Sequence, residues 1–230
     1  MCGRFSLTVP ERFFSTAFVF NDIPEMQPNY NIPPGVDIWA VRNQNTSNDK
    51  EIVKLRWGLV PFWVKDPSIG NRMINARSET LAEKPAFRSA FQSRRCLIPA
   101  DGFFEWQRDG KNRTPYFIKR KEGQPFAMAG LWEKWESSTG ERLESCTILT
   151  TSPNELMKEL HDRMPVMLNA EKMEIWLNQE STRKSLQELT APYPTEDMEA
   201  YPVSSLVNSP KNNGPECLER QEILQQDELF

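Results

Sequence analysis

The second residue, Cys2, has the most unusual chemical potential in the chain, because removal of Met1 would give it a free α-amine beside its thiol. The ordinary pKa values of these groups are about 7.7–8.0 and about 8.5, so both are partly reactive at neutral pH. An aldehyde could form an imine with the amine and then close onto the thiol as a five-membered thiazolidine. A small residue at position 2 also simply permits removal of methionine, so other segments must decide between the two interpretations.

Two further segments contain side chains suited to binding or catalysis, the amide of Asn75 and the carboxyl group of Glu105. Asn75 lies among arginines, downstream of Trp57 and Trp63, in a mixture that can hold phosphates and stack bases. Glu105 lies between large aromatic residues, where loss of water would raise its pKa and suit it to proton transfer. The ordinary alternatives are that the tryptophans belong to the core and that the carboxylate is exposed on a strand.

His161 is the only histidine in the sequence and begins the segment 161–165, His-Asp-Arg-Met-Pro. Histidine exchanges protons near neutral pH, which suits it to acid and base catalysis. A single histidine is more often incidental, so its interpretation depends on the residues around it.

Length and composition limit which kinds of protein the chain can be. With 230 residues, 38% of them hydrophobic, the chain can bury a substantial core as one domain. The four cysteines are far apart and form no CxxC pair, so we expect no metal and no other cofactor. We find no signal peptide and no apolar run of membrane-spanning length, and therefore expect a cytoplasmic protein, without membrane contact, whose thiols stay reduced.

Charge argues against one mode of nucleic-acid binding. A formal net charge of -4 does not suit non-specific coating of nucleic acid, which usually needs a broad positive surface. Arginines nevertheless recur beside the informative segments, whereas acidic residues crowd positions 180–228. The pattern is compatible with a local basic groove, or with scattered surface ion pairs that contribute little.

The order of elements predicts an α+β fold with an antiparallel, barrel-like twisted β core decorated by helices. Short β-type runs alternate with turns, which favours hairpins over repeated βαβ units. We expect strands at 36–41, 52–57, 115–119, 126–131 and 146–151, turns at 108–111 and 137–140, and a loop at 30–35. We expect helices at 11–20, from Ser152 through Pro153 to Leu160, and after Asn169, where Met173, Trp176 and Leu177 would be buried.

Several motifs, taken in order, resemble the SRAP family (SOS response-associated peptidases). They are Met1-Cys2-Gly3-Arg4-Phe5, Tyr30-Asn31 with Pro34-Gly35, Trp57-Gly58, Asn75-Ala76-Arg77, 101–106 (Asp-Gly-Phe-Phe-Glu-Trp), 161–165, Pro202-Val203-Ser204 and Val207-Asn208. The resemblance implies a single SRAP domain over 1–214, followed by a polar tail at 215–230.

The resemblance also implies covalent capture of abasic sites in single-stranded DNA, as part of the response to DNA damage. Cys2 would form the thiazolidine, Glu105 would move protons, His161 would act on the sugar oxygen, and Asn75 would hold the lesion. Arg4, Arg77 and Arg163 would bind flanking phosphates, while Pro34 and Trp106 would line the gap left by the missing base. We expect a monomer that associates with the nucleoid when bound to DNA, shields the lesion from cleavage and has weak lyase activity.

Three other functions remain open on the sequence. Class II glutamine amidotransferases also expose an N-terminal cysteine, but the chain has neither an Asn-Gly-Glu segment nor room for a synthetase domain. Peptidase activity, as in the family name, would use Cys2, Glu105 and His161, and we restrict it to autocatalytic removal of Met1. A non-catalytic interaction module would leave this set of residues without a purpose.

Overall fold

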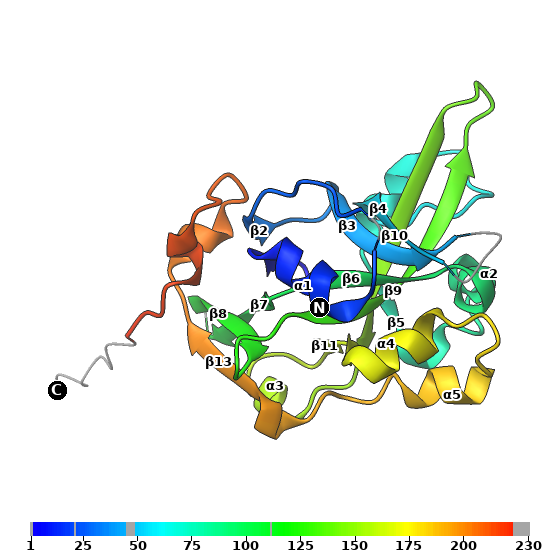
Figure 1. Cartoon of the computed structure of the whole chain (residues 1–230). Coiled ribbons are helices and arrows are strands. Elements are labelled where there is room, and N and C mark those ends of the chain that lie inside the picture. The colour runs from blue at the N-terminus through cyan, green and yellow to red at the C-terminus, as the bar shows by residue number, and fades with distance from the viewer. Residues whose placement is uncertain (1, 21, 45–48, 111, 223–230) are drawn as a thin grey trace, which may run out of the picture.

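Five strands follow one another around a closed barrel, in the order β10, β4, β3, β6, β9 and back to β10 (Figure 1). The structure is a computed structural model that describes residues 2–20, 22–44, 49–110 and 112–222. The barrel strands are β3 (Asp37–Asn43), β4 (Lys50–Trp57), β6 (Arg95–Ala100), β9 (Phe126–Glu136) and β10 (Arg142–Thr151). The expected α+β fold with an antiparallel, barrel-like core is therefore confirmed.

Two pairings of β10 are parallel, one inside the barrel and one outside it, and the sequence did not predict either. β4 runs parallel to β10 with Trp57 opposite Cys146, and β5 (Asn75–Arg77) runs parallel to the same strand with Asn75 opposite Ile148. The chain thus ends its pairing with β10 at Trp57 and pairs with β10 again from Asn75. The intervening loop carries the 3-10 helix η1 (Pro67–Arg72).

Alternation along the strands separates two hydrophobic layers. On β9, Phe126, Met128 and Trp132 belong to one core cluster, whereas Ala127, Ala129 and Leu131 belong to another. The second cluster is covered by helices. These are α1 (Pro10–Ala17), α2 (Pro85–Ser93), α4 (Ala170–Leu177) and α5 (Arg183–Glu188).

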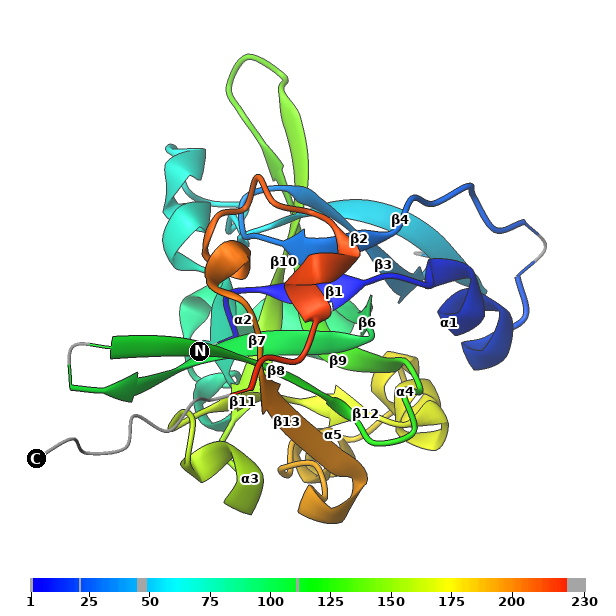
Figure 2. The ribbon, with the colours of Figure 1, turned by 90° about the vertical axis from the view of Figure 1, so that its left-hand side faces the viewer.

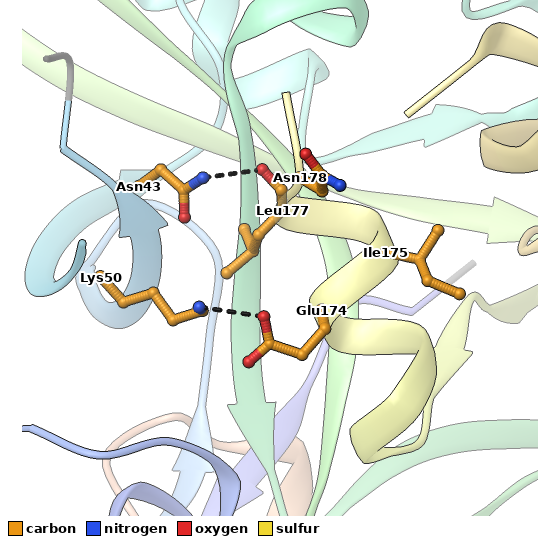
Figure 3. A pocket seen from close by; sticks show the side chains of 6 residues that line it. All are labelled: Asn43, Lys50, Glu174, Ile175, Leu177 and Asn178. Carbon is orange, nitrogen blue, oxygen red and sulfur yellow. Dashed lines mark hydrogen bonds and ion pairs between the residues drawn. The ribbon is translucent and has the colours of Figure 1, made fainter. Parts of the chain in front are cut away.

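Side-chain contacts attach α4 to the barrel (Figure 3). Asn43 Nδ2 donates to the carbonyl oxygen of Leu177 at 2.9 Å, and Lys50 Nζ lies 2.9 Å from Glu174 Oε2. These residues line a cavity of about 310 Å³. The lysine charge at this cavity is therefore already paired.

A second sheet brings the N-terminal strand beside the strand that carries Glu105 (Figure 2). Its order is β13 (Met198–Pro202), β8 (Asn112–Arg120), β7 (Gly102–Asp109), β1 (Phe5–Leu7) and β2 (Asn29–Ile32). Phe5 on β1 lies opposite Ile32 on one side and Phe103 on the other. This sheet, rather than the barrel, positions the start of the chain.

Several predicted boundaries need correction. The first helix ends at Ala17, and the loop expected at 30–35 begins with strand β2. The helix expected from Ser152 is the single turn α3 (Glu155–Lys158), because the Asn154 side chain accepts from Met157 N at 2.9 Å and caps the turn. The helix after Asn169 and the turn at 137–140 are confirmed. Of the turn at 108–111, Lys111 lies outside the described residues.

The remaining elements are short. They are β11 (Met164–Pro165), β12 (Met167–Leu168), and the 3-10 helices η2 (Ser78–Thr80), η3 (Thr195–Asp197), η4 (Ser205–Asn208) and η5 (Pro215–Leu218). Residues after 214 still contact the fold, since Cys217 is buried and Tyr201 Oη donates to the Leu218 carbonyl oxygen. In the described ranges, every helix is too short or too polar to cross a membrane.

Candidate active site

Cys2 and Asn75 meet where the second sheet approaches the barrel. Asn75 Nδ2 donates to the carbonyl oxygen of Cys2 at 2.8 Å. Asn75 is the first residue of β5 and is held there by its pairing with Ile148 on β10. Asn75 Oδ1 is also buried and accepts no hydrogen bond from the described residues. This hydrogen bond from β5 adds to the support that β1 gives the start of the chain, and it leaves the Asn75 amide oxygen without a partner among the described residues.

The electrostatic environment of Cys2 includes Glu105. The Cys2 side chain is fully buried, and Glu105 on β7 is 4% exposed. Burial, and after it the negative charge of Glu105, raises the pKa of the Cys2 thiol from 9.0 to about 12. Since the thiolate is the nucleophile, the thiol must lose its proton to a base during reaction. Glu105 is the acidic residue whose charge acts on this thiol.

His161 follows α3 and faces an open cavity. Its backbone N–H donates to the Met157 carbonyl oxygen at 2.7 Å, and its side chain is 28% exposed. The cavity, of about 520 Å³, is also lined by Trp106 and Arg108 of β7. Trp106 directly follows Glu105 on β7, so the two side chains project from opposite faces of this strand.

Residues 1–210 match the family model described as SOS response associated peptidase (SRAP). The chain belongs to this family. The abasic site processing protein YoqW of Bacillus subtilis (strain 168) is 51% identical over 226 residues, which cover 95% of this chain and 99% of that protein. The abasic site processing protein HMCES of Xenopus tropicalis is 32% identical over 263 residues, covering 95% of this chain and 78% of that protein.

Solved structures support the same assignment. A crystal structure of a protein from Bacteroides thetaiotaomicron has a TM-score of 0.84 and 28% sequence identity, covering 96% of this chain and all of that one. A crystal structure of a protein from Bordetella bronchiseptica has a TM-score of 0.75 at 25% identity. The SRAP fold described above is therefore shared with experimentally determined structures.

In this SRAP protein the three arginines expected at DNA phosphates differ in accessibility. Arg77 is exposed, two residues after Asn75 and so on the same side of β5. Arg163 makes a bidentate ion pair with Glu79, at 2.7 and 2.9 Å, and also donates to the Thr150 carbonyl oxygen at 2.6 Å. Its side chain is 13% exposed. Arg77 thus presents its charge to solvent, whereas the Arg163 charge is paired.

Arg4 is largely buried and joins the N-terminal strand to the C-terminal segment. Its Nη1 donates to Asn31 Oδ1 at 2.6 Å and to the Val207 carbonyl oxygen at 2.7 Å. The Asn31 amide in turn donates to the carbonyl oxygens of Ser209 and Asn212. The described contacts of Arg4 are thus internal to the SRAP fold.

The two residues expected to line the gap of a missing base are both half-buried. Pro34 lies in the turn between β2 and β3. Trp106 Nε1 donates to Asn208 Oδ1 at 2.7 Å, and the Arg4 guanidinium lies 6.0 Å from the centre of its ring. The indole is therefore held both by this hydrogen bond and by packing against the cluster that contains Phe104 and Phe117.

Trp57 and Trp63 lie six positions apart in the sequence but differ in burial. Trp57 is fully buried and donates through Nε1 to the Ile74 carbonyl oxygen at 2.9 Å, so it is a core residue. Trp63 is 54% exposed and stands beside Phe62, which is 58% exposed. Of these two tryptophans, only Trp63 exposes ring surface to a ligand.

Sequence reasoning assigned no role to Asn31, Glu79, Asp162 and Asn208. Asn31 and Asn208 lie within the motifs of the SRAP resemblance, and this position was the feature of the sequence that could have drawn attention to them. Glu79 lies two residues after Arg77, but its pairing with Arg163 spans 84 positions of the sequence and no local pattern predicts it. Among the described residues, no three His, Cys, Asp or Glu side chains are placed to hold a metal ion.

Proposed function

We propose that this SRAP protein captures abasic sites in single-stranded DNA by forming a thiazolidine at Cys2. The observation that carries the proposal is the hydrogen bond between Asn75 and the Cys2 carbonyl oxygen, formed beside buried Glu105. It supports a position for the Cys2 thiol, and for the α-amine that loss of Met1 would free, near the Glu105 carboxylate, which is the arrangement needed for condensation with an aldehyde. The relatives are named abasic site processing proteins, which supports abasic DNA as the substrate.

The reaction would take place in two steps. Once Met1 has been removed, the Cys2 α-amine adds to the ring-opened C1′ aldehyde of the sugar, and loss of water gives an imine. The Cys2 sulfur then adds to the imine carbon, its proton ends on the nitrogen, and the thiazolidine closes. The net change is aldehyde plus aminothiol to thiazolidine plus water. Met1 itself lies outside the described residues.

Glu105 would serve as the base and acid of both steps. The raised pKa of the Cys2 thiol makes the thiolate scarce at neutral pH, so ring closure needs a proton acceptor nearby. Glu105 would give a proton to the hydroxyl group that leaves the carbinolamine and regain one from the nitrogen as the imine forms. At ring closure it would take the thiol proton and pass it to the same nitrogen. Ring closure also protects the strand, because an open imine permits β-elimination; we propose that lyase activity is correspondingly weak.

Asn75 and His161 would position the sugar. The buried Asn75 Oδ1 would accept a hydrogen bond from the Cys2 amine or from a sugar hydroxyl, which would hold the aldehyde near the nucleophile. His161, at the edge of the cavity it shares with Trp106, would exchange a proton with the sugar ring oxygen as the ring opens.

Single-stranded DNA suits this site better than a duplex. An unpaired strand can splay its backbone and present the sugar to a recessed nucleophile, whereas a duplex encloses it. We propose Arg77 as a phosphate contact, and Arg163 as a second one that must share or exchange its pairing with Glu79. Pro34 and Trp106 would line the gap left by the missing base, and exposed Trp63 would stack on a neighbouring base. Arg4, which we expected at a flanking phosphate, would reach one only by exchanging its contacts with Asn31 and Val207.

We further propose that residues 1–214 form the functional domain, acting as a monomer, and that the same site removes Met1. Cys2, Glu105 and His161 would be the groups available for that single peptide cleavage. Intact mass of the protein purified with Glu105→Gln would test it, since retention of Met1 in this variant alone would support self-processing. Met1 missing from the variant as it is from the wild type would assign the removal to an aminopeptidase.

The first experiment is a crosslinking assay. A single-stranded oligonucleotide with one uracil, treated with uracil-DNA glycosylase, is mixed with protein whose loss of Met1 has been confirmed by intact mass. We expect a slow band on a denaturing gel without borohydride, and its absence with Cys2→Ala or untreated oligonucleotide. No band with the processed wild type would reject the proposed function.

A further inference from the structure

Glu79 occupies the side of Arg163 with which this arginine could bind a phosphate. Arg163 Nη1 donates to Glu79 Oε1 at 2.7 Å, and Nη2 donates to Glu79 Oε2 at 2.9 Å. A guanidinium group makes the same two-point contact with a phosphate. The Arg163 side chain is 13% exposed, so the ion pair is largely shielded from water. The carboxylate therefore lies where a phosphate group would bind.

The other N–H groups of Arg163 cannot replace this contact. A guanidinium group has five N–H donors, of which Glu79 takes two. One on Nη2 donates to the Thr150 carbonyl oxygen at 2.6 Å, and Nε is buried without an acceptor among the described residues. A single N–H on Nη1 remains. A phosphate can thus take two hydrogen bonds from Arg163 only after Glu79 has left.

Arg77 lies close to this ion pair. It is opposite Thr150 in the register of β5 with β10, and Thr150 is the residue whose carbonyl oxygen binds Arg163. The hydrogen bonds from Arg163 lower the pKa of the Glu79 carboxyl group, and the charge of Arg77 also lowers it. Two positive charges therefore act on one carboxylate, and the second belongs to an exposed side chain.

This group of charges lies next to the candidate active site. Asn75, which binds the Cys2 carbonyl oxygen, precedes Arg77 by two residues on the same side of β5. Two residues of a strand span about 6.6 Å. A DNA strand whose sugar lies at Cys2 would therefore bring a neighbouring phosphate towards Arg77 and Arg163.

We propose that Glu79 is a specificity-determining residue, whose carboxylate competes with DNA phosphates for Arg163 and so weakens binding to undamaged single strands. Its meaning for specificity rests on the proposed function. An undamaged strand is held only by reversible contacts, so the competition shortens its stay. A strand with an abasic site meets the same competition but is then held by the covalent bond at Cys2. The competition thus lowers occupancy by undamaged DNA without loosening the crosslink.

Fluorescence anisotropy with an undamaged single-stranded oligonucleotide tests the competition. In Glu79→Gln we expect the affinity to rise by about 2–5-fold, the size set by a partly exposed ion pair. The slope of log affinity against log salt concentration should grow in magnitude by up to about 0.7, the value for one phosphate contact on a single strand. Glu83→Gln removes the same charge from an exposed residue four positions away. It is the matched control and should keep the wild-type affinity and slope.

Crosslinking in the presence of undamaged competitor measures the effect on specificity. The abasic oligonucleotide is kept far below its dissociation constant, and undamaged oligonucleotide is added in increasing amounts. Half-inhibition of crosslinking should need about 2–5-fold less competitor for Glu79→Gln than for the wild type. Glu83→Gln should need the wild-type amount.

A double-mutant cycle assigns the effect to Arg163. In the Arg163→Gln background, Glu79→Gln should change the affinity little, because the carboxylate has lost the group for which it competes. Glutamine keeps an oxygen acceptor for Arg163, and the melting temperature of each variant checks that it is folded. Glu79→Asp, whose carboxylate is one carbon shorter in reach, is a second variant and should show part of the same gain.

The outcomes separate this proposal from the proposed function. An affinity of Glu79→Gln equal to or below that of the wild type would overturn the competition, and so would a gain that persists without Arg163. If the wild type forms no crosslink but Glu79→Gln gains affinity through Arg163, the proposed function fails and the competition stands. If the wild type forms the crosslink and the gain is absent, the proposed function stands and the role of Glu79 fails.

Discussion

The side-chain amide of Asn75 donates a hydrogen bond to the carbonyl oxygen of Cys2, across 73 positions of sequence. The contact holds the backbone of Cys2 through its carbonyl oxygen and does not involve its nitrogen or its thiol. In the proposed reaction, the amine and the thiol would therefore keep their position without using the groups that react.

Asn75→Ala should slow crosslinking, because it removes the side chain that holds the Cys2 backbone and that would also hydrogen-bond to the sugar or the amine. We expect a decrease in rate of about 10–100-fold, equivalent to about 1.4–2.7 kcal/mol. The measurement is the single-turnover rate of band formation with abasic oligonucleotide. Asn169→Ala is the control, because it removes the cap of α4 at a cost of about 1 kcal/mol in stability without touching Cys2. Equal rates for the two variants would assign only a structural role to Asn75.

Cys2→Ser should separate the two steps of the reaction. The α-amine remains and forms the imine, but the hydroxyl group closes a ring far less readily than the thiol does. We expect a crosslink that survives a denaturing gel only after borohydride reduction, together with more strand cleavage than in the wild type. A borohydride-independent crosslink as stable as that of the wild type would contradict thiazolidine formation.

Arg77→Ala should weaken DNA binding in a salt-dependent way, because Arg77 is exposed beside Asn75. We expect the slope of log affinity against log salt concentration to fall in magnitude by about 0.7, the value for one phosphate contact on a single strand. Fluorescence anisotropy with an uncleaved, unreactive oligonucleotide from 50 to about 200 mM salt measures this slope. Arg183→Ala, an exposed arginine on α5, should leave it unchanged.

Asp101→Asn should raise stability at neutral pH. Asp101 Oδ2 accepts from the Thr8 N–H just before α1, and burial raises the pKa of this carboxyl despite that bond. A raised pKa favours the neutral form, so this contribution to stability is present below the unfolded pKa and is lost as pH rises through the folded one. Asparagine keeps a neutral acceptor at every pH.

The size of the Asp101→Asn effect should be on the order of 1 kcal/mol at pH 7, and it should shrink as pH falls through the raised pKa. Denaturant unfolding at pH 7 and at pH 4 measures the difference between variant and wild type. Asp101→Ala, which loses the acceptor as well as the charge, should be less stable than Asp101→Asn at both values. An asparagine variant that is less stable than the wild type at pH 7 would refute the argument.

Much of the fold could be predicted because its signals are local. Asn169 before Met173 and Trp176 marks a capped amphipathic helix, and Gly140 marks a hairpin turn, where its φ is +87°. The parallel pairing of β5 with β10 could not be predicted, because it depends on where a loop returns rather than on any pattern within Asn75–Arg77. The start of α3 could not be predicted either. Ser152 and Asn154 are both suitable N-cap residues, and the structure uses Asn154.

The candidate site was predictable in type but not in arrangement. Cys2, Glu105 and Asn75 could be singled out by their chemistry and by the SRAP resemblance. The burial of Arg4 could not, because its partners Asn31 and Val207 come from distant segments. The same holds for the Arg163 pair with Glu79. A positive charge in a sequence does not say whether it faces solvent or a carboxylate.

β4 and β5 both pair in parallel with β10, one after the other along it. The loop between Trp57 and Asn75 connects these two strands. Its two ends lie opposite Cys146 and Ile148, two residues apart on a single strand. Because the cost of closing a loop grows only slowly with its length, this loop can lengthen or shorten between relatives while the barrel stays intact. Exposed Phe62 and Trp63 are carried by this loop, so their position can change without any change in the barrel strands.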